Sequence, residues 1–117
     1  MLTDEVTPET LAAYLSSPDR PSSLIVGNRT LAVRIIQSIN ALNISVPADL
    51  SVFCIDEPDD AWQLRPQLSR LRINVEDFTR QGIRCLLQLI RHENPEKTES
   101  RNYEFVEAGS CAPPASR

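Results

Sequence analysis

The sequence predicts an α/β fold, a three-layer αβα arrangement built around a mostly parallel sheet. The main evidence lies between Ser23 and Asp56, where two short apolar runs, residues 24–26 and 52–55, flank a segment with helical periodicity. Runs that are so short and so continuously apolar are typical of buried strands. Two strands joined by a helix lie parallel, so their carboxyl ends meet at one edge of the sheet. Ligands of α/β proteins usually bind at that edge, which makes Asn28 and Asp56 the first candidate site residues.

Length, charge and cysteine spacing narrow the function classes. The chain has 117 residues, enough for one domain, and a net charge of -4, which argues against holding nucleic acid by itself. The first residues lack the features of a signal peptide, and no apolar run approaches a membrane span, so we expect a cytoplasmic protein without membrane contact. The cysteines are far apart, which indicates no metal site. Cys54 and Cys85 are therefore expected to be small core residues.

The remaining elements follow from helix caps, turn residues and apolar periodicity. A helix is expected to begin at Thr7-Pro8 and to end before the loop of residues 16–21. The other expected elements are a strand at 23–26, a helix at 30–42, strands at 51–55 and 68–73, a helix at 75–91 and a strand at 103–106. This divides the chain into an N-terminal helix and loop (1–20), an α/β domain (21–107) and a flexible tail (108–117).

An acidic loop follows Asp56 and contains Trp62, the only tryptophan. Acidic loops at strand ends can hold Mg²⁺ or orient a phosphate, so a phosphotransfer site is one interpretation. The lysine and the phosphate-binding glycines expected beside such acids are missing. The alternative is a solvated loop whose Trp62 anchors it to the domain or to a second subunit.

The motifs of common enzymes are missing from the sequence. The Gly-x-Ser-x-Gly turn of serine hydrolases and the glycine-rich dinucleotide fingerprint do not occur. His92, the only histidine, follows the last apolar turn of the helix at 75–91, where it suits a charge at a helix end better than a catalytic base. The sequence therefore predicts neither catalysis nor a cofactor.

Several short segments, in order, resemble one known family. They are residues 21–28, 46–57, 66–72 and 107–114. Their order and spacing are similar to the effector-binding region of lac-repressor-type (LacI/GalR) transcriptional regulators. The resemblance implies a partial periplasmic-binding-protein-like (type I) lobe. In that family two α/β lobes close over a sugar or a similar small effector, and a dimer presents its DNA-binding heads.

The resemblance also implies roles for particular residues. Asn28 matches the family's asparagine that hydrogen-bonds effector hydroxyls, and Asp56 matches the acid that accepts from sugar hydroxyls. From the residues alone, the favoured interpretation is that Asn28 caps the helix and Asp56 holds a loop. Arg29 stands where the family commonly has an acid. A cation at a helix N-terminus calls for an anionic partner, either an acid of the following loop or a charged effector, so the expected effector is sugar-like or anionic.

Two functions follow from the resemblance. The first is an effector-sensing domain, truncated, that reaches DNA only through a head domain absent from this chain. The alternative is a dimerisation module without ligand binding, in which the polar face of the helix at 30–42 and the following acidic loop meet a second copy. The candidate interface residues are Trp62, Leu64 and Arg34, and either function implies a homodimer.

The helix at 75–91 raises a separate question. In the family the equivalent segment crosses to another lobe, which this chain lacks. Its apolar face is therefore expected to pack locally on the sheet of this domain or to dock on another copy. Gly82 within it is expected to mark a close-packing site. The residues of the face are Phe78, Ile83, Leu86, Leu87 and Ile90.

Overall fold

The computed structural model describes residues 6–57, 63–95 and 103–114. Along the chain, helix α1 (Pro8–Leu15) precedes strand β1 (Ser23–Val26), helix α2 (Arg29–Ala41) and strand β2 (Ser51–Ile55). The chain continues with β3 (Ser69–Ile73), helix α3 (Val75–Ile90) and β4 (Tyr103–Val106). These elements agree closely with the sequence prediction, because each one carries its own local signal. Thr7, for example, caps α1 through a reciprocal capping box with Thr10.

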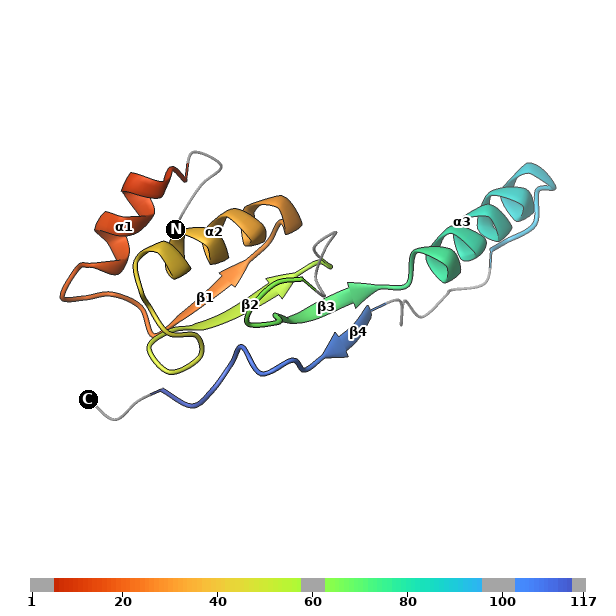
Figure 1. The fold of residues 1–117 in the computed structure, drawn as a ribbon. Coiled ribbons are helices and arrows are strands. Elements are labelled where there is room, and N and C mark those ends of the chain that lie inside the picture. Colours follow the sequence, from red (N-terminus) through yellow and green to blue (C-terminus); the bar gives the residue numbers. More distant parts are fainter. Residues whose placement is uncertain (1–5, 58–62, 96–102, 115–117) are drawn as a thin grey trace.

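The strands form one sheet in the order β1-β2-β3-β4 (Figure 1). β1 and β2 are parallel with Val26 opposite Cys54, and β2 and β3 are parallel with Cys54 opposite Arg70. Only β4 runs antiparallel to its neighbour, β3. The predicted α/β fold with a mostly parallel sheet is therefore confirmed.

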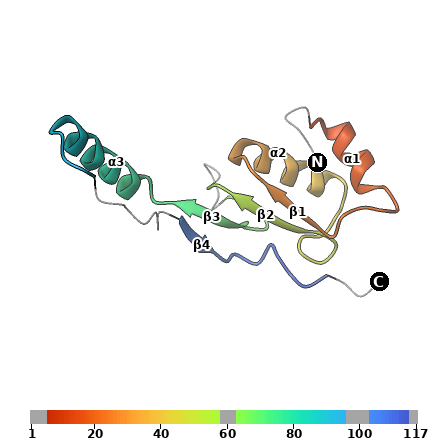
Figure 2. The ribbon, with the colours of Figure 1, turned by 180° about the vertical axis from the view of Figure 1, so that it is seen from behind.

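Helices α1 and α2 both lie over the same face of the sheet, as the views from the front and from behind show (Figures 1 and 2). The core forms between them and the strands, because α2 directs one apolar stripe toward β1 and β2. Cys54 belongs to this core and is fully buried, as predicted. The buried apolar residues are Val6, Leu11, Leu15, Val26, Ala32, Ile35, Ile36, Ile39, Leu50, Val52, Cys54 and Leu68.

The opposite face of the sheet carries exposed apolar side chains. Strand alternation places Ile25 and Phe105 on this face, where their side chains are 71% and 62% exposed. Phe53 stacks on Phe105 with ring centroids 5.7 Å apart, which covers part of the face. Of the three layers expected, the described residues therefore build two, the sheet and the layer of α1 and α2.

Helix α3 projects away from the sheet (Figures 1 and 2), and none of its residues is buried. The Cα radius of gyration is 18.3 Å, whereas a compact chain of this length would have about 13 Å. Of the two alternatives predicted for the apolar face of α3, packing on the sheet of this domain is therefore wrong, and docking on another copy stays untested. Asn74 alone connects β3 to α3, so the helix continues beyond the strand instead of turning back. Cys85 is consequently not a core residue, and a Cβ at Gly82 would meet no atom within 4 Å.

The segment after β4 is bound to the sheet. At the level of Val52, β2 has no neighbour from β3, and the segment after β4 lies beside β2 there instead. The Val52 amide donates to the Ser110 carbonyl over 2.9 Å. The buried Ser110 hydroxyl donates to the Val52 carbonyl and accepts from the Ser69 amide. The expectation of a flexible tail is therefore wrong for residues 108–112, because these hydrogen bonds fix them.

Candidate functional site

The carboxyl ends of β1 and β2 bring the two candidate ligand residues to one edge of the sheet. Asn28 follows Val26 by two residues, Asp56 follows Cys54 by two residues, and Val26 and Cys54 are paired across the parallel strands. Both residues therefore leave the sheet at the same level on neighbouring strands. This is the arrangement in which α/β sheets usually bind small ligands.

Asn28 caps α2, as the structural alternative had predicted. Its Oδ1 accepts from the backbone amides of Thr30 at 2.9 Å and Leu31 at 3.1 Å. Among the described residues, its side-chain Nδ2 has no hydrogen-bond partner. The cap thus uses the amide oxygen, holds the side chain in one orientation, and leaves the amide donor at the edge.

Asp56 is half-buried, and its Oδ1 accepts from the backbone amide of Glu57 at 2.8 Å. No described residue donates to its second carboxylate oxygen. Burial, with a smaller contribution from the Asp56 charge, raises the pKa of the Cys54 thiol to about 11. The site therefore has a neutral thiol beneath it and one carboxylate at its surface.

Arg29 is the first residue of α2 and is exposed beside Asn28. It contributes a positive charge where the helix dipole already favours anions. The residues that directly follow β1 and β2 thus offer an amide donor, a carboxylate acceptor and a cation.

An ion-pair network beside Asp56 was missed by the sequence analysis. Glu57 lies 2.7 Å from the Arg70 guanidinium and 3.8 Å from that of Arg72, and Arg72 also pairs with Glu104. The Arg70 side chain is only 12% exposed, and its buried Nε has no hydrogen-bond partner within the part of the chain that the structure describes. The sequence did contain a sign of this network. Arg70 and Arg72 are two residues apart in the predicted strand, which places both side chains on one face of β3, next to an acidic strand end.

Arg34 and Leu64, two of the predicted interface residues, lie on a hollow of about 610 Å³ at the side of α2. Gln37 and Asn40 also line this hollow. Asn40 donates to the Arg65 carbonyl at 3.3 Å, and this hydrogen bond holds the segment at Arg65 against α2. Trp62, the third predicted residue, lies outside the described residues.

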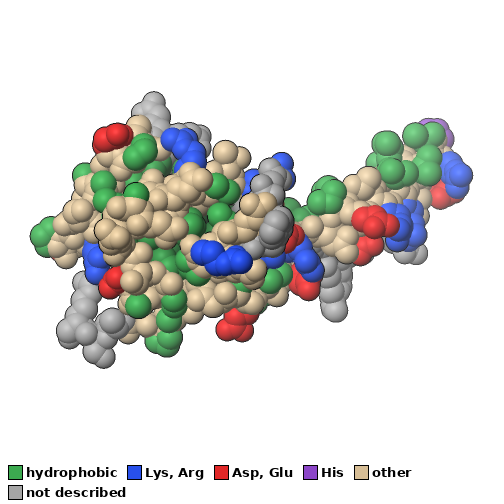
Figure 3. Space-filling model, in the orientation of Figure 1, with side chains coloured by type: hydrophobic (Ala, Val, Ile, Leu, Met, Phe, Trp, Pro, Cys, Tyr) green, Lys and Arg blue, Asp and Glu red, His purple; other side chains and the backbone are tan. Residues whose placement is uncertain are grey.

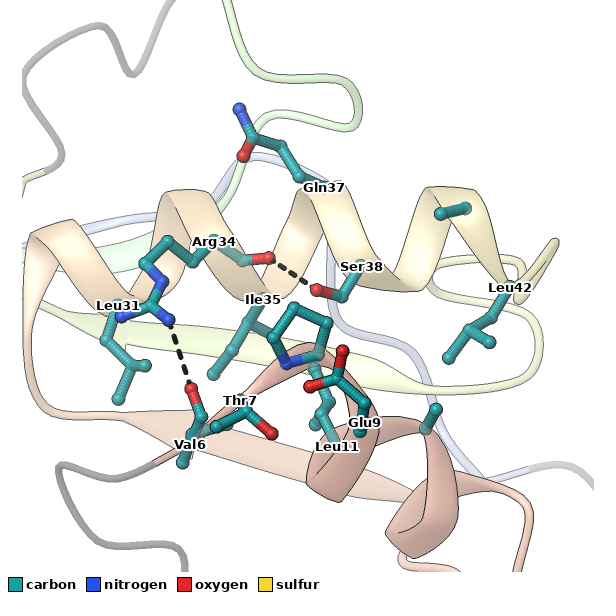
Figure 4. A pocket seen from close by; sticks show the side chains of 13 residues that line it. Val6, Thr7, Glu9, Leu11, Leu31, Arg34, Ile35, Gln37, Ser38 and Leu42 are labelled. Carbon is teal, nitrogen blue, oxygen red and sulfur yellow. Dashed lines mark hydrogen bonds between the residues drawn. The ribbon is translucent and has the colours of Figure 1, made fainter.

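A second groove of about 520 Å³ separates α1 from α2 (Figure 4). Arg34 reaches across it and donates to the Val6 carbonyl at 3.3 Å, while Gln37 points away from α1. Neither Asn28 nor Asp56 lines this groove. The two hollows flank the outer surface of α2, which is therefore indented on both sides.

Within the described ranges, no three His, Cys, Asp or Glu side chains are grouped closely enough to hold a metal ion. Two of the four acids of the magnesium interpretation, at positions 59 and 60, lie outside those ranges. Among the described helices, none has the length and apolar character needed to cross a membrane.

Comparison with known proteins supports the topology. Residues 2–111 match the family of periplasmic binding protein-like domains. The HTH-type transcriptional regulator LacR of Lactobacillus helveticus is 29% identical over 104 residues, which cover 88% of this chain and 30% of LacR. The chain thus spans less than a third of the length of this relative.

Solved structures show the same architecture. A LacI family transcriptional regulator from Bifidobacterium animalis subsp. lactis superposes with a TM-score of 0.84 and 29% identity, over 98% of this chain and 44% of that one. A LacI family regulator from Arthrobacter sp. FB24, solved in complex with lactose, superposes with a TM-score of 0.72 and 22% identity, over 90% of this chain and 40% of that one. The second similarity concerns the fold alone.

Proposed function

Because the chain belongs to the family of periplasmic binding protein-like domains, in the form that LacI family regulators contain, we propose that it senses a small effector. The effector is sugar-like or anionic and binds at the edge formed by β1 and β2. The main support for this proposal is the position of Asn28 and Asp56. Each follows by two residues a member of the pair Val26–Cys54, at the carboxyl ends of parallel strands.

The chemistry of the edge suits a polyhydroxylated ligand. A sugar hydroxyl both donates and accepts, so it can accept from the Asn28 Nδ2 and donate to the open oxygen of Asp56. A hydrogen bond to a carboxylate is stronger than one between neutral groups. Arg29 adds a cation for a carboxylate or phosphate substituent of the effector.

The same proposal extends to the role of the protein in the cell. LacR, of which this chain covers 30%, is named a transcriptional regulator, and we infer a cytoplasmic, non-enzymatic role in transcription regulation. With a net charge of -4, the chain would reach DNA through a separate head domain. The site needs no cofactor, because binding and release of the effector are sufficient for sensing.

Ligand-observed NMR on the 117-residue chain tests effector binding, with lactose and glucose 6-phosphate as probes. Asp56→Asn removes the carboxylate at constant size, and we expect it to weaken binding by about tenfold or more. Asp19→Asn makes the same change in charge at an exposed position before β1 and is the matched control. Equal binding by wild type and Asp56→Asn, or no binding of either probe, would contradict sensing by this chain.

A second candidate function is dimerisation without ligand binding, through the outer surface of α2. The observation that favours it is the pair of hollows on either side of the helix, lined by Arg34, Gln37 and Leu64. Gln37 is exposed and lines both hollows, so Gln37→Arg would bring like charges together across a symmetric interface. Analytical ultracentrifugation should show weakened association in this variant. Intact dimers without any response to the sugars would favour this second function.

A further inference from the structure

Arg70 lies at a position where packing alone would favour an apolar side chain. Leu68, Arg70 and Arg72 alternate along the chain, so their side chains point to the same face of the sheet. Leu68 belongs to the core, and so does Cys54, which is paired with Arg70 across β2 and β3. Arg70 therefore borders the core, and its side chain is only 12% exposed.

The guanidinium of Arg70 loses hydration at this position, and its partners replace that hydration only in part. Its Nη1 donates to the Leu68 carbonyl at 3.0 Å, and its Nη2 donates to the Glu57 carboxylate at 2.7 Å. The buried Nε has no partner among the described residues. An unsatisfied buried donor is unfavourable, and a buried ion pair is often no more stable than apolar residues of similar size. Fold stability alone therefore does not explain this arginine.

The residue that Arg70 holds is Glu57. One carboxylate oxygen of Glu57 accepts from Arg70, and the other lies 3.8 Å from the Arg72 guanidinium. Arg72 also pairs with Glu104, which connects the network to β4. Figure 3 shows basic and acidic side chains gathered between the body of the molecule and the projecting helix α3. The Glu57 side chain is thus held by two cations from one face of β3.

We infer that Arg70 is a positioning residue of the effector edge, which orients the Asp56 carboxylate by holding Glu57. The link between them is the Glu57 backbone amide, which donates to Asp56 Oδ1 at 2.8 Å. With Glu57 fixed, the second oxygen of Asp56 has a defined place for an effector hydroxyl, and such prior orientation lowers the entropic cost of binding. The inference rests on the function proposed above, in which Asp56 binds the effector.

The χ1 rotamer of Asp56 provides a measurement that needs no ligand. Three-bond Hα–Hβ couplings in NMR spectra of the 117-residue chain distinguish one staggered rotamer from an average over several. In wild type we expect the couplings of a single rotamer. Arg70→Met retains a long unbranched side chain without its charge, so it should release Glu57 and shift the Asp56 couplings toward the averaged values. Circular dichroism verifies that the variant is folded.

Two further variants control this measurement. Arg80→Met is the matched control, because it makes the same substitution and breaks an ion pair of the same length, the 2.7 Å pair of Arg80 with Glu76 on α3. It should leave the Asp56 couplings unchanged. Arg70→Lys keeps a cation that can reach Glu57, so it should retain the single-rotamer couplings that Arg70→Met loses.

Effector binding is the second measurement, by ligand-observed NMR with lactose and glucose 6-phosphate as probes. Arg70→Met should weaken binding by about threefold to tenfold, and Arg80→Met should leave it unchanged. Because Arg70 acts through Glu57, adding Arg70→Met to Glu57→Gln should weaken binding by less than about a further twofold.

The two measurements separate this inference from the proposed function. If wild type binds neither probe, the proposed function is contradicted, and the Asp56 couplings still decide whether Arg70 orients the carboxylate. Unchanged couplings in Arg70→Met, or the same change in Arg80→Met, would overturn the role of Arg70. Additive effects of Arg70→Met and Glu57→Gln on binding would overturn the route through Glu57.

Discussion

At the scale of single residues, Asn28 combines two roles with different atoms. Its Oδ1 accepts from two backbone amides at the start of α2, and its Nδ2 is the donor proposed for the effector. The capping and ligand-binding interpretations of this residue therefore do not exclude each other. The cap fixes the orientation of the donor before any ligand arrives, which lowers the entropic cost of binding.

Substitutions of Asn28 should separate these roles. Asn28→Asp retains an oxygen for the cap, so we expect unchanged stability in urea but loss of sugar binding, because the donor is gone. Asn28→Ala should cost about 1 kcal/mol of unfolding free energy, since both amides of α2 lose their acceptor. Similar destabilisation by the two substitutions would contradict this separation.

The buried thiol of Cys54 makes the stability of the protein depend on pH. Burial raises its pKa from 9.0 to about 11, so the folded protein keeps the thiol protonated at a pH where the unfolded chain has lost the proton. Stability from this residue is therefore complete below pH 9. It should fall as the pH rises from 9 toward 11, by up to about 1.4 kcal/mol per pH unit.

The measurement is urea unfolding of wild type and Cys54→Ala across this range under reducing conditions. Other groups titrate in both proteins, so the difference between them isolates Cys54. We expect the variant to lose less stability than wild type between pH 9 and 11. Parallel pH dependence of the two proteins would show that the thiol is not responsible.

At the scale of elements, local signals explain what the sequence could predict. β1, β2 and β4 have the predicted limits, and the helices differ from prediction by a residue or two at their ends. Caps, turn residues and apolar periodicity lie within each segment, so one sequence is sufficient to find them. Contacts between distant segments leave no such local signal. The failures therefore concern the free face of α3 and the binding of residues 108–112.

Ser110 is the clearest of these long-range contacts. Its hydroxyl is completely buried and serves both Val52 and Ser69, which lie on different strands. Ser110→Ala would leave the Ser69 amide without its acceptor and the Val52 carbonyl with only the weak thiol donor of Cys111 at 3.5 Å. We expect a loss of about 1 to 3 kcal/mol in urea unfolding. The exposed Ser22→Ala should change stability by less than about 0.5 kcal/mol, and equal effects of the two variants would contradict the contact.

At the scale of the whole molecule, the shape follows from the separation of α3 from the sheet. The principal extents are 59 × 27 × 26 Å, much longer than a globular chain of this size would need. Small-angle scattering of the 117-residue chain, extrapolated to zero concentration, should give a radius of gyration near 18.3 Å. A value near the compact expectation of about 13 Å would mean that α3 folds back onto the body.

The candidate site could be predicted in part for the same reason as the fold. Asn28 and Asp56 end consecutive apolar runs, and a parallel crossover necessarily brings such ends together. The pairing of Glu57 with Arg70 and Arg72 depends on which strand follows β2 in the sheet. That order cannot be read from periodicity, because the connection from β2 to β3 carries no helical pattern to indicate a parallel crossover.

The proposed effector edge can be tested most directly by following the side-chain amide of Asn28 in ¹H–¹⁵N NMR spectra during titration with lactose. We expect a saturable shift of the Asn28 Nδ2 resonances together with the backbone amides of Arg29 and Glu57, and we expect these shifts to disappear in Asp56→Asn. Saturable shifts confined to the groove between α1 and α2, or unchanged shifts in the variant, would contradict effector binding at this edge.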